Sequence, residues 1–214
     1  MNKQLYITGI CKISDNNISL NGNSVFSNPK QISVNEFLKN GYRDLKIQYP
    51  KFFKMDSICK LGFLTVEILL GGNPSIKAYP SELVGVVLSN SSSSLNTDID
   101  FYETIKDTEN YFPSPAVFVY TLPNIIIGEI CIRHKFKGEN VFFVSEQFDP
   151  NILFNTIQNI FAFTNIQCVI TGWVELLNTH YDSFLCTIER INNDEETVNN
   201  DIFDIENLSN IYLK

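Results

Sequence analysis

Residues 120–140 read YTLPNIIIGEICIRHKFKGEN, and the apolar run Val141–Ser145 follows them directly. The spacing of apolar residues from Asn124 to Lys135 predicts a helix that carries Gly128. The next run, Val141–Ser145, is too short for a helix and predicts a buried strand. This part of the chain should therefore form a helix, a short connection and a strand.

Signals on both sides extend this pattern into an α/β domain. Asp149-Pro150 predicts a helix start, because an Asp side chain caps free amides and Pro fits the first helical position. The other expected elements are a strand at 5–14, a short helix at 34–40 within a loop at 15–48, a helix at 51–70, a strand at 83–88, a helix near 97–104, a helix from 150 to about 163, and strands at 167–176 and 184–191. Alternation of this kind predicts one α/β layer domain with a largely parallel sheet.

The same stretch carries a spacing that resembles ketosynthases and their chain-length-factor relatives. In that family a helix with a small residue is followed by a glycine turn and a strand, and the catalytic Cys stands at the end of the strand. The matching motif consists of Pro123, Asn124, Gly128, Gly138 and Asn140. The family places its two glycines ten residues apart and the Cys nine residues further on. Counted without gaps, the position of the Cys is held by Gln147.

Two other segments support the resemblance. Residues 6–10, YITGI, are similar to the opening strand of the family, and residues 50–56, PKFFKMD, resemble the start of an early family helix. The resemblance covers roughly residues 5–190, the first of two half-folds. It implies α/β class: a single thiolase-like half-fold with a five-stranded mixed sheet and helices on both faces. Residues 1–191 would form this domain, and 192–214 an acidic, Asn-rich tail that is mobile or weakly helical.

Gln147 decides what this resemblance implies about chemistry. A ketosynthase needs a thiolate that accepts an acyl chain, and a Gln side chain forms no thioester. The family also uses two histidines from its second half-fold, and His134 and His180 match neither position. Phe148 and Asp149 replace small residues and would crowd an acyl pocket. No catalytic residue is therefore expected, and the family's acyltransferase activity is not expected of this chain alone.

Gln147 leaves two interpretations open. Chain-length factors, the inactive partners of ketosynthases, often carry Gln at this position, as do some decarboxylating loading domains. Alternatively, Gln147 is a polar residue at a helix start, kept after an active site was lost.

Other candidate residues have ordinary explanations. His134 suits a helix C-terminus, where it stabilises the dipole, and His180 falls in a polar loop. Ser91–Ser94 lack the glycines and lysine of a phosphate-binding loop, so a surface turn is expected. Glu129 and Glu175 lie in apolar surroundings, but no spacing makes them an acid/base pair.

The composition limits the classes of binding partner and the cellular compartment that we expect for this protein. The chain has 214 residues with a net charge of −8, which disfavours nucleic acid and an electrostatic membrane contact. Its five cysteines are not closely spaced, so reduced thiols in a cytoplasmic protein are expected and a zinc site is not. No signal peptide or membrane span is evident. No cofactor or metal is implied.

The resemblance implies a protein that works with a partner. Family members dimerise by pairing the strand before the nucleophile with its twin, here Val141, Phe142, Phe143, Val144 and Ser145. A chain with only the first half-fold should expose apolar surface where the second half would pack.

Three functions follow, in order of preference. The first is a non-catalytic, chain-length-factor-like subunit that pairs with a full-length ketosynthase in polyketide, aryl-polyene or fatty-acid-type biosynthesis. The second is an acyltransferase or a malonyl-carrier-protein decarboxylase of the ketosynthase family. The third is a homodimer that binds an acyl chain or an acyl carrier protein without chemistry.

Overall fold

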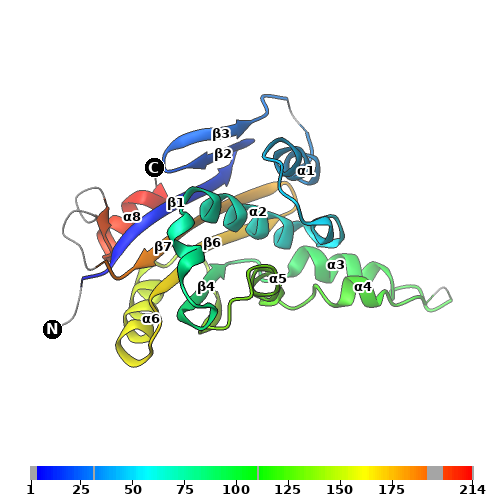
Figure 1. The fold of residues 1–214 in the computed structure, drawn as a ribbon. Coiled ribbons are helices and arrows are strands. Elements are labelled where there is room, and N and C mark those ends of the chain that lie inside the picture. The colour runs from blue at the N-terminus through cyan, green and yellow to red at the C-terminus, as the bar shows by residue number, and fades with distance from the viewer. Residues whose placement is uncertain (1–3, 31, 110, 192–199, 214) are drawn as a thin grey trace.

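The computed structural model describes residues 4–30, 32–109, 111–191 and 200–213. Its centre is one mixed sheet with the order β3-β2-β1-β7-β6-β4-β5, and β8 pairs with β1 beside this path (Figure 1). The strands are β1 (Tyr6–Ser14), β2 (Asn17–Leu20), β3 (Asn23–Ser27), β4 (Val84–Asn90), β5 (Asn140–Val144), β6 (Cys168–Leu177), β7 (His180–Glu189) and β8 (Asp201–Ile202). The expected α/β class with a mixed sheet is confirmed, but the sheet has eight strands where five were expected.

Two of the extra strands come from residues that the sequence assigned to a loop. β1, β2 and β3 form a meander joined by the tight turns Asp15-Asn16 and Asn21-Gly22, whose residues all have positive φ. Asn, Asp and Gly tolerate that conformation, which two-residue hairpin turns require. The polar composition of the segment reflects these turns and an exposed sheet edge.

The sheet is also less parallel than expected. Only the pairings of β4 with β5 and with β6 are parallel, whereas the other pairings are antiparallel. The two-residue turn at 178–179 explains this for β6 and β7, because such a short connection permits only an antiparallel hairpin.

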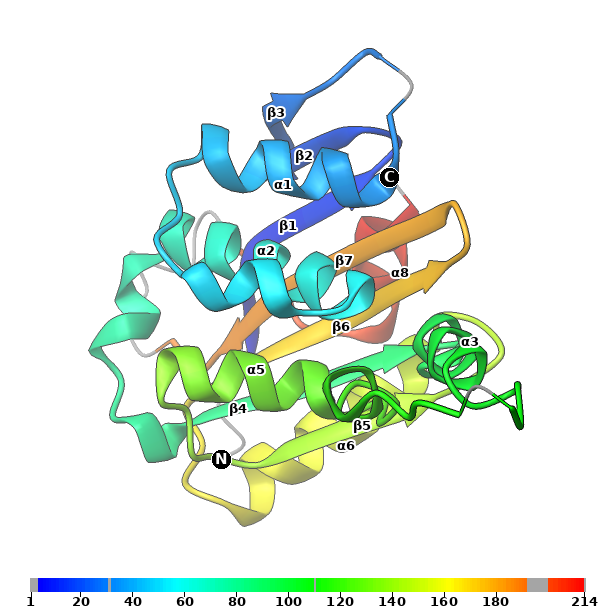
Figure 2. The ribbon, with the colours of Figure 1, turned by 90° about the vertical axis from the view of Figure 1, so that its right-hand side faces the viewer.

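Helices cover both faces of the sheet, as expected. α1 (Val34–Asp44), α2 (Ser57–Gly72) and α5 (Ile125–His134) lie on one face, and α6 (Pro150–Phe163) and α8 (Ile205–Leu213) lie on the other (Figures 1 and 2). Each face has its own apolar core, one built around α2 and the other around α6. No helix of the described residues has both the length and the apolar character to cross a membrane.

α2 is the central helix of the first face. The carboxylate of Asp56 accepts the amide of Cys59 at 2.9 Å and so sets the helix start after the 3-10 turn η1 (Pro50–Lys54). The expected helix at 51–70 is therefore a 3-10 turn followed by an α-helix. Gly62 lets α5 approach closely, because a Cβ there would lie 2.2 Å from Ile126 Cδ1.

Residues 200–213 belong to the segment expected to be a mobile or weakly helical tail, and they form a short strand and a helix that pack on the domain. β8 adds to β1, and Phe203 and Leu208 are buried in the core around α6. α8 packs beside α6 on the same face. Apolar residues at helical spacing within an acidic, Asn-rich segment explain this packing. Residues 192–199 lie outside the described residues.

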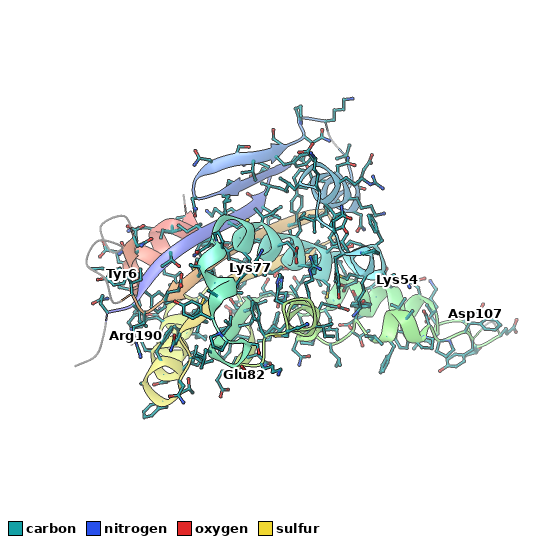
Figure 3. All side chains as sticks on the ribbon, viewed as in Figure 1. Tyr6, Lys54, Lys77, Glu82, Asp107 and Arg190 are labelled. Carbon is teal, nitrogen blue, oxygen red and sulfur yellow. The ribbon has the colours of Figure 1, made fainter. Side chains whose placement is uncertain are left out.

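Two further helices, α3 (Leu95–Glu103) and α4 (Pro115–Phe118), form a projecting arm, defined here as residues 95–122. The arm extends away from the sheet, with Asp107 at its far end (Figure 3). The rings of Phe101 and Phe118 pack at 5.2 Å and join its two helices. The remaining short elements are the 3-10 turns η2 (Pro74–Ala78) and η3 (Ser81–Leu83).

Candidate functional site at the β5–α6 connection

β5 is the last strand of the sheet, and the described residues place no strand on its outer side. Phe142 packs on the core around α2, whereas Val141 and Phe143 pack on the core around α6. Val144 is 54% exposed at the carboxyl end of the strand. The strand proposed from the sequence as an interface therefore lies at an open sheet edge, where backbone groups are free to pair with another chain.

Gln147 lies in the turn that joins β5 to α6, and it is exposed. Ser145 holds the turn at both ends, because its amide donates to Asn90 O at 2.9 Å and its hydroxyl donates to Gln147 O at 2.9 Å. The position matched to the family nucleophile is thus at the end of the expected strand and just before the expected helix. Its side chain is an uncharged amide, which offers no nucleophile.

Asp149 caps α6, as the sequence predicted. Its Oδ1 accepts the amides of Asn151 at 2.9 Å and Ile152 at 3.3 Å. Further along the helix, Asn155 and Asn159 are exposed, as is Asn151. These asparagines make much of the outer face of α6 polar, whereas Phe163 at its last residue is 84% exposed.

Phe148 fills the space beneath the turn. Its ring stacks on Tyr212 of α8 at 4.2 Å and meets the rings of Trp173 at 6.2 Å and Phe184 at 5.8 Å edge-on. We call these four residues the aromatic cluster. Phe148 and Asp149 were expected to crowd an acyl pocket; in the structure Phe148 packs in the aromatic cluster and Asp149 caps α6.

Polar contacts fix Tyr212 over this cluster. Its hydroxyl donates to Asp182 Oδ2 at 2.9 Å, and the Lys12 ammonium donates to its carbonyl at 2.7 Å. Lys12 also lies over the rings of Phe184 and Tyr212, at 5.7 Å and 5.9 Å from their centroids. These contacts hold α8 against the sheet beside the β5–α6 turn.

The motif residues lie in and around α5 and at the start of β5. Asn124 immediately precedes α5, Gly128 lies within it, Gly138 lies in the connection and Asn140 begins β5. Gly138 is required by packing, since a Cβ there would lie 2.4 Å from Val84 O. A Cβ at Gly128 would meet nothing closer than 3.9 Å, so packing does not demand a glycine there.

The cysteines provide no activated thiol. All five are free, and Cys11, Cys59, Cys168 and Cys186 are buried. Burial raises the pKa of each of these four thiols, and that of Cys131 as well. Their thiolate population at neutral pH is therefore small. Among the described residues, no three His, Cys, Asp or Glu side chains come together in a way that could hold a metal ion.

The two histidines lie in different settings. His134 ends α5, and its Nε2 lies 3.0 Å from Glu67 Oε1. Arg133 donates to the same carboxylate through Nε at 2.8 Å and Nη2 at 3.2 Å. His134 therefore joins α5 to α2, where the sequence suggested a solvated or dipole-stabilising residue. His180 is exposed at the start of β7.

Glu129 and Glu175 have separate partners, although Glu129 Oε2 and Glu175 Oε1 accept no hydrogen bond from the described residues. Glu129 is paired with Lys51 at 2.7 Å and accepts the Tyr120 hydroxyl at 3.0 Å. Glu175 Oε2 accepts the amides of Ser91 and Ser92 at 2.7 Å and 3.0 Å. The serine turn at 91–94 therefore binds a carboxylate of its own chain, and this use was not evident from the sequence.

Two surfaces were missed by reasoning from the sequence. The arm contains eight of the sixteen exposed large hydrophobic side chains among the described residues. They are Leu95, Ile99, Tyr102, Tyr111, Phe112, Phe118, Val119 and Leu122. The sequence signal for this surface was the group of aromatic residues within a connection that contains prolines. A connection that is only a loop rarely carries so many aromatic residues.

The second missed surface is basic. Lys39, Arg43, Lys46 and Lys54, here called the basic cluster, lie on or beside α1 and in η1. They have no ion-pair partner among the described residues, and three of them are exposed. Lys54 lies on the side of the molecule from which the arm projects (Figure 3). A local excess of cations in a chain of net charge −8 was the signal for this surface.

No protein-family model matches the sequence, and no curated protein matches it. Solved structures do share its fold, and those considered below are ketosynthases and their complexes with chain-length factors or carrier proteins. The resemblance read from residues 120–140 is thus confirmed at the level of the fold.

One such structure is the ishigamide ketosynthase/chain length factor, which is 16% identical and superposes with a TM-score of 0.65 over 87% of this chain and 62% of its own. Another is the AntDE:AntF complex, a type II polyketide synthase ketosynthase with its acyl carrier protein. It is 12% identical, with a TM-score of 0.61 over 92% of this chain and 64% of its own. A third is the ketosynthase ApeO with its chain length factor ApeC from Xenorhabdus doucetiae, at 14% identity and a TM-score of 0.54 over 88% and 79%.

This chain spans less than two thirds of the length of the first two structures. Identities of 12–16% establish a shared fold, and activity has to be argued from the residues of this chain.

Proposed function

We propose that this protein is a non-catalytic, ketosynthase-like subunit that pairs with a complete ketosynthase, much as a chain-length factor does. The proposal rests mainly on Gln147, an exposed residue that follows the open edge strand β5 and whose side chain has no nucleophilic group. The family fold supports a place in polyketide-type or aryl-polyene synthesis, since the similar structures include complexes of that kind. Free thiols favour a reducing compartment, so we place the subunit in the cytoplasm.

The open edge of β5 supports pairing with another chain. A strand added along Val141–Ser145 would continue the sheet through its backbone hydrogen bonds. The arm supports the same conclusion independently, because contiguous exposed apolar side chains mark protein interfaces. Tyr102, Phe112 and Phe118 are 59%, 74% and 58% exposed, which is costly for a chain that works alone.

The surroundings of Gln147 support a non-catalytic role. Phe148 occupies the adjoining space with the rings of Trp173, Phe184 and Tyr212, so an acyl chain would have to displace a packed cluster. The native thiols are free but have raised pKa values. These features favour a partner role over the acyltransferase or decarboxylase alternative.

Pairing is tested by mixing the purified protein with the ketosynthase encoded beside it and measuring the mass of the complex by light scattering. Val144→Asp should abolish a heterodimer, because it places a charge on the outer edge of β5 without disturbing the core. The control is Ile132→Asp, at a similarly exposed residue (64%) on α5. Absence of any complex would overturn the proposal. Self-association through β5 would favour the homodimer alternative instead.

The basic cluster supports a second partner with an acidic surface, and a carrier protein is the candidate of that chemistry in this family. A carrier protein is bound to its ketosynthase in the AntDE:AntF complex. Calorimetry with the carrier protein encoded nearby tests this, using the double variant Lys46→Glu/Lys54→Glu. Lys77→Glu, a change in η2 on another part of the molecule, is the control. Equal affinity for wild type and the double variant would exclude the basic cluster as the docking surface.

A further inference from the structure

Lys60 is a buried cation with no bonded partner. It stands one turn into α2, its side chain is only 7% exposed, and it forms no hydrogen bond or ion pair with the described residues. A lysine is rarely buried in this way unless it is paired. Lys60 lines a hollow of about 230 Å³, and its Nζ is not among the fully buried unpartnered polar atoms, so the end of the side chain keeps some access to solvent.

The nearest carboxylate of its own helix is committed elsewhere. Asp56 accepts the amide of Cys59 at 2.9 Å through Oδ1 and the hydroxyl of Thr97 at 2.6 Å through Oδ2. Asp56 therefore offsets part of the charge of Lys60 without bonding to it. Lys39 acts in the opposite direction, since burial and this second cation both lower the pKa of Lys60.

Three helices begin at the same hollow. Its lining includes Asn35 from the first turn of α1, Ser57 and Ile58 from the first turn of α2, and Ser94 and Asn96 from the start of α3. The first amides of a helix have no intrahelical acceptor, and the dipole makes this end positive. α1, α2 and α3 come together on the side shown in Figure 2.

A larger hollow of about 620 Å³ adjoins the first and shares Asn35, Ser57, Asn96, Asp100 and Leu176 with it. Its remaining lining is mostly polar, with Asp15, Asn16, Asn178 and Thr179 at the two hairpin turns. Asp56 and Asp100 line the inner hollow together with Lys60 and the helix starts, and the outer hollow adds Asp15 and the side-chain amides of Asn16 and Asn178.

We infer that this site binds a small polar molecule through an anionic group, a carboxylate or a phosphate, held by Lys60 and the helix starts. The rest of the molecule would carry hydroxyl or ammonium donors, which Asp15, Asp100 and the amide oxygens accept. The site lies on the α2 face of the sheet, whereas Phe148 beside Gln147 packs on the α6–α8 face. It is therefore independent of the proposed partner function.

The test measures how fast Lys60 is acetylated by acetic anhydride in the native protein, read by mass spectrometry, with inorganic phosphate in one arm and acetate in the other. Ionic strength is kept constant with sodium chloride. At about ten times its Kd, the bound anion should slow labelling of Lys60 roughly tenfold, because only free protein reacts. Lys46, exposed and outside both hollows, is the internal control.

Equal slowing of Lys60 and Lys46 would mean weak, non-specific ion binding and would overturn the inference, as would no slowing in either arm. Slowing in one arm alone identifies phosphate or carboxylate as the bound group. A Lys60→Met variant should lose the calorimetric signal of the same anion, and Lys46→Met should keep it. The labelling experiment uses the unaltered chain, so the inference remains testable if Lys60→Met does not fold.

Discussion

Phe148 stacks on Tyr212, with ring centroids 4.2 Å apart and ring planes inclined by 30°. Phe148, the residue that follows Gln147, is thereby joined to α8. Since α8 also carries the buried Leu208, this contact belongs to the core that covers one face of the sheet. The same stack closes that face and fills the space beside Gln147.

Changes at Tyr212 should show how much this contact contributes. Tyr212→Ala removes the ring from a half-buried stack and should lower the free energy of unfolding by about 2 kcal/mol. Tyr212→Phe keeps the ring and loses only the hydrogen bond to Asp182, so a loss of about 1 kcal/mol is expected. Urea denaturation followed by fluorescence measures both. Equal losses would mean that the hydroxyl, and not the stack, holds α8.

The two motif glycines should respond to alanine in opposite directions. Gly138→Ala would place a Cβ 2.4 Å from a backbone oxygen, which has to move, so about 2 kcal/mol or more should be lost. Gly128→Ala lies in a helix with open space around it and should gain roughly 0.5–1 kcal/mol from helix propensity. Thermal and urea unfolding of the two variants form a matched pair. A loss at Gly128 would show that this glycine serves a contact with another chain.

The parts of the fold predicted from the sequence were those with local signals. The α5–β5–α6 order followed from apolar periodicity and the Asp149-Pro150 helix start, and each element lies within a few residues of its expected bounds. The hairpin turns at Asp15-Asn16 and Asn21-Gly22 were missed because the polar residues of this segment were taken to indicate a long loop. These residues are instead the ones that tight turns require. The tail was expected to be mobile or weakly helical, and the packing of α8 on the core was missed because acidic and Asn-rich residues surround its apolar side.

Features of the site that depend on contacts between segments far apart in the sequence could not be predicted. The aromatic cluster joins Phe148, Trp173, Phe184 and Tyr212, and their meeting depends on strand register and on where α8 lies. The same limitation applies to Lys60, whose setting is made by three helix starts separated along the chain. The position of Gln147 between a strand and a helix could be predicted because that argument used only neighbours on one continuous stretch.

Glu67 should make stability depend on pH in the acid range. Burial alone would raise the pKa of its carboxyl, but hydrogen bonds from His134 and Arg133 outweigh it and lower the pKa to about 2. Because the folded pKa lies below the unfolded one near 4.5, the contribution is complete above that value and is lost as pH falls toward 2.

The expected size is about 3 kcal/mol, obtained from the separation of the two pKa values. Glu67→Gln should therefore flatten the stability profile between pH 5 and pH 2 (the range set by the two pKa values), measured by urea denaturation at each pH. Glu82→Gln should change the profile much less, because the pKa of Glu82 is also lowered but its pair with Lys137 is exposed and screened by solvent. An unchanged slope in Glu67→Gln would mean that other carboxylates control acid unfolding.

Gln147→Cys tests the proposal that this chain is non-catalytic, by placing a thiol at the position matched to the nucleophile of the similar family. The new cysteine would be exposed in the β5–α6 turn, so it should react with a disulfide reagent at least about tenfold faster than the four buried native thiols. It should nevertheless take up no acyl group and release no carbon dioxide from malonyl carrier protein, because Phe148 fills the adjoining space. Reaction of one extra thiol per chain, together with absent turnover, is the expected pair of results. Turnover in Gln147→Cys would show that the site is intact apart from its nucleophile, and loss of a measurable wild-type decarboxylation in Gln147→Ala would restore the enzymatic alternative.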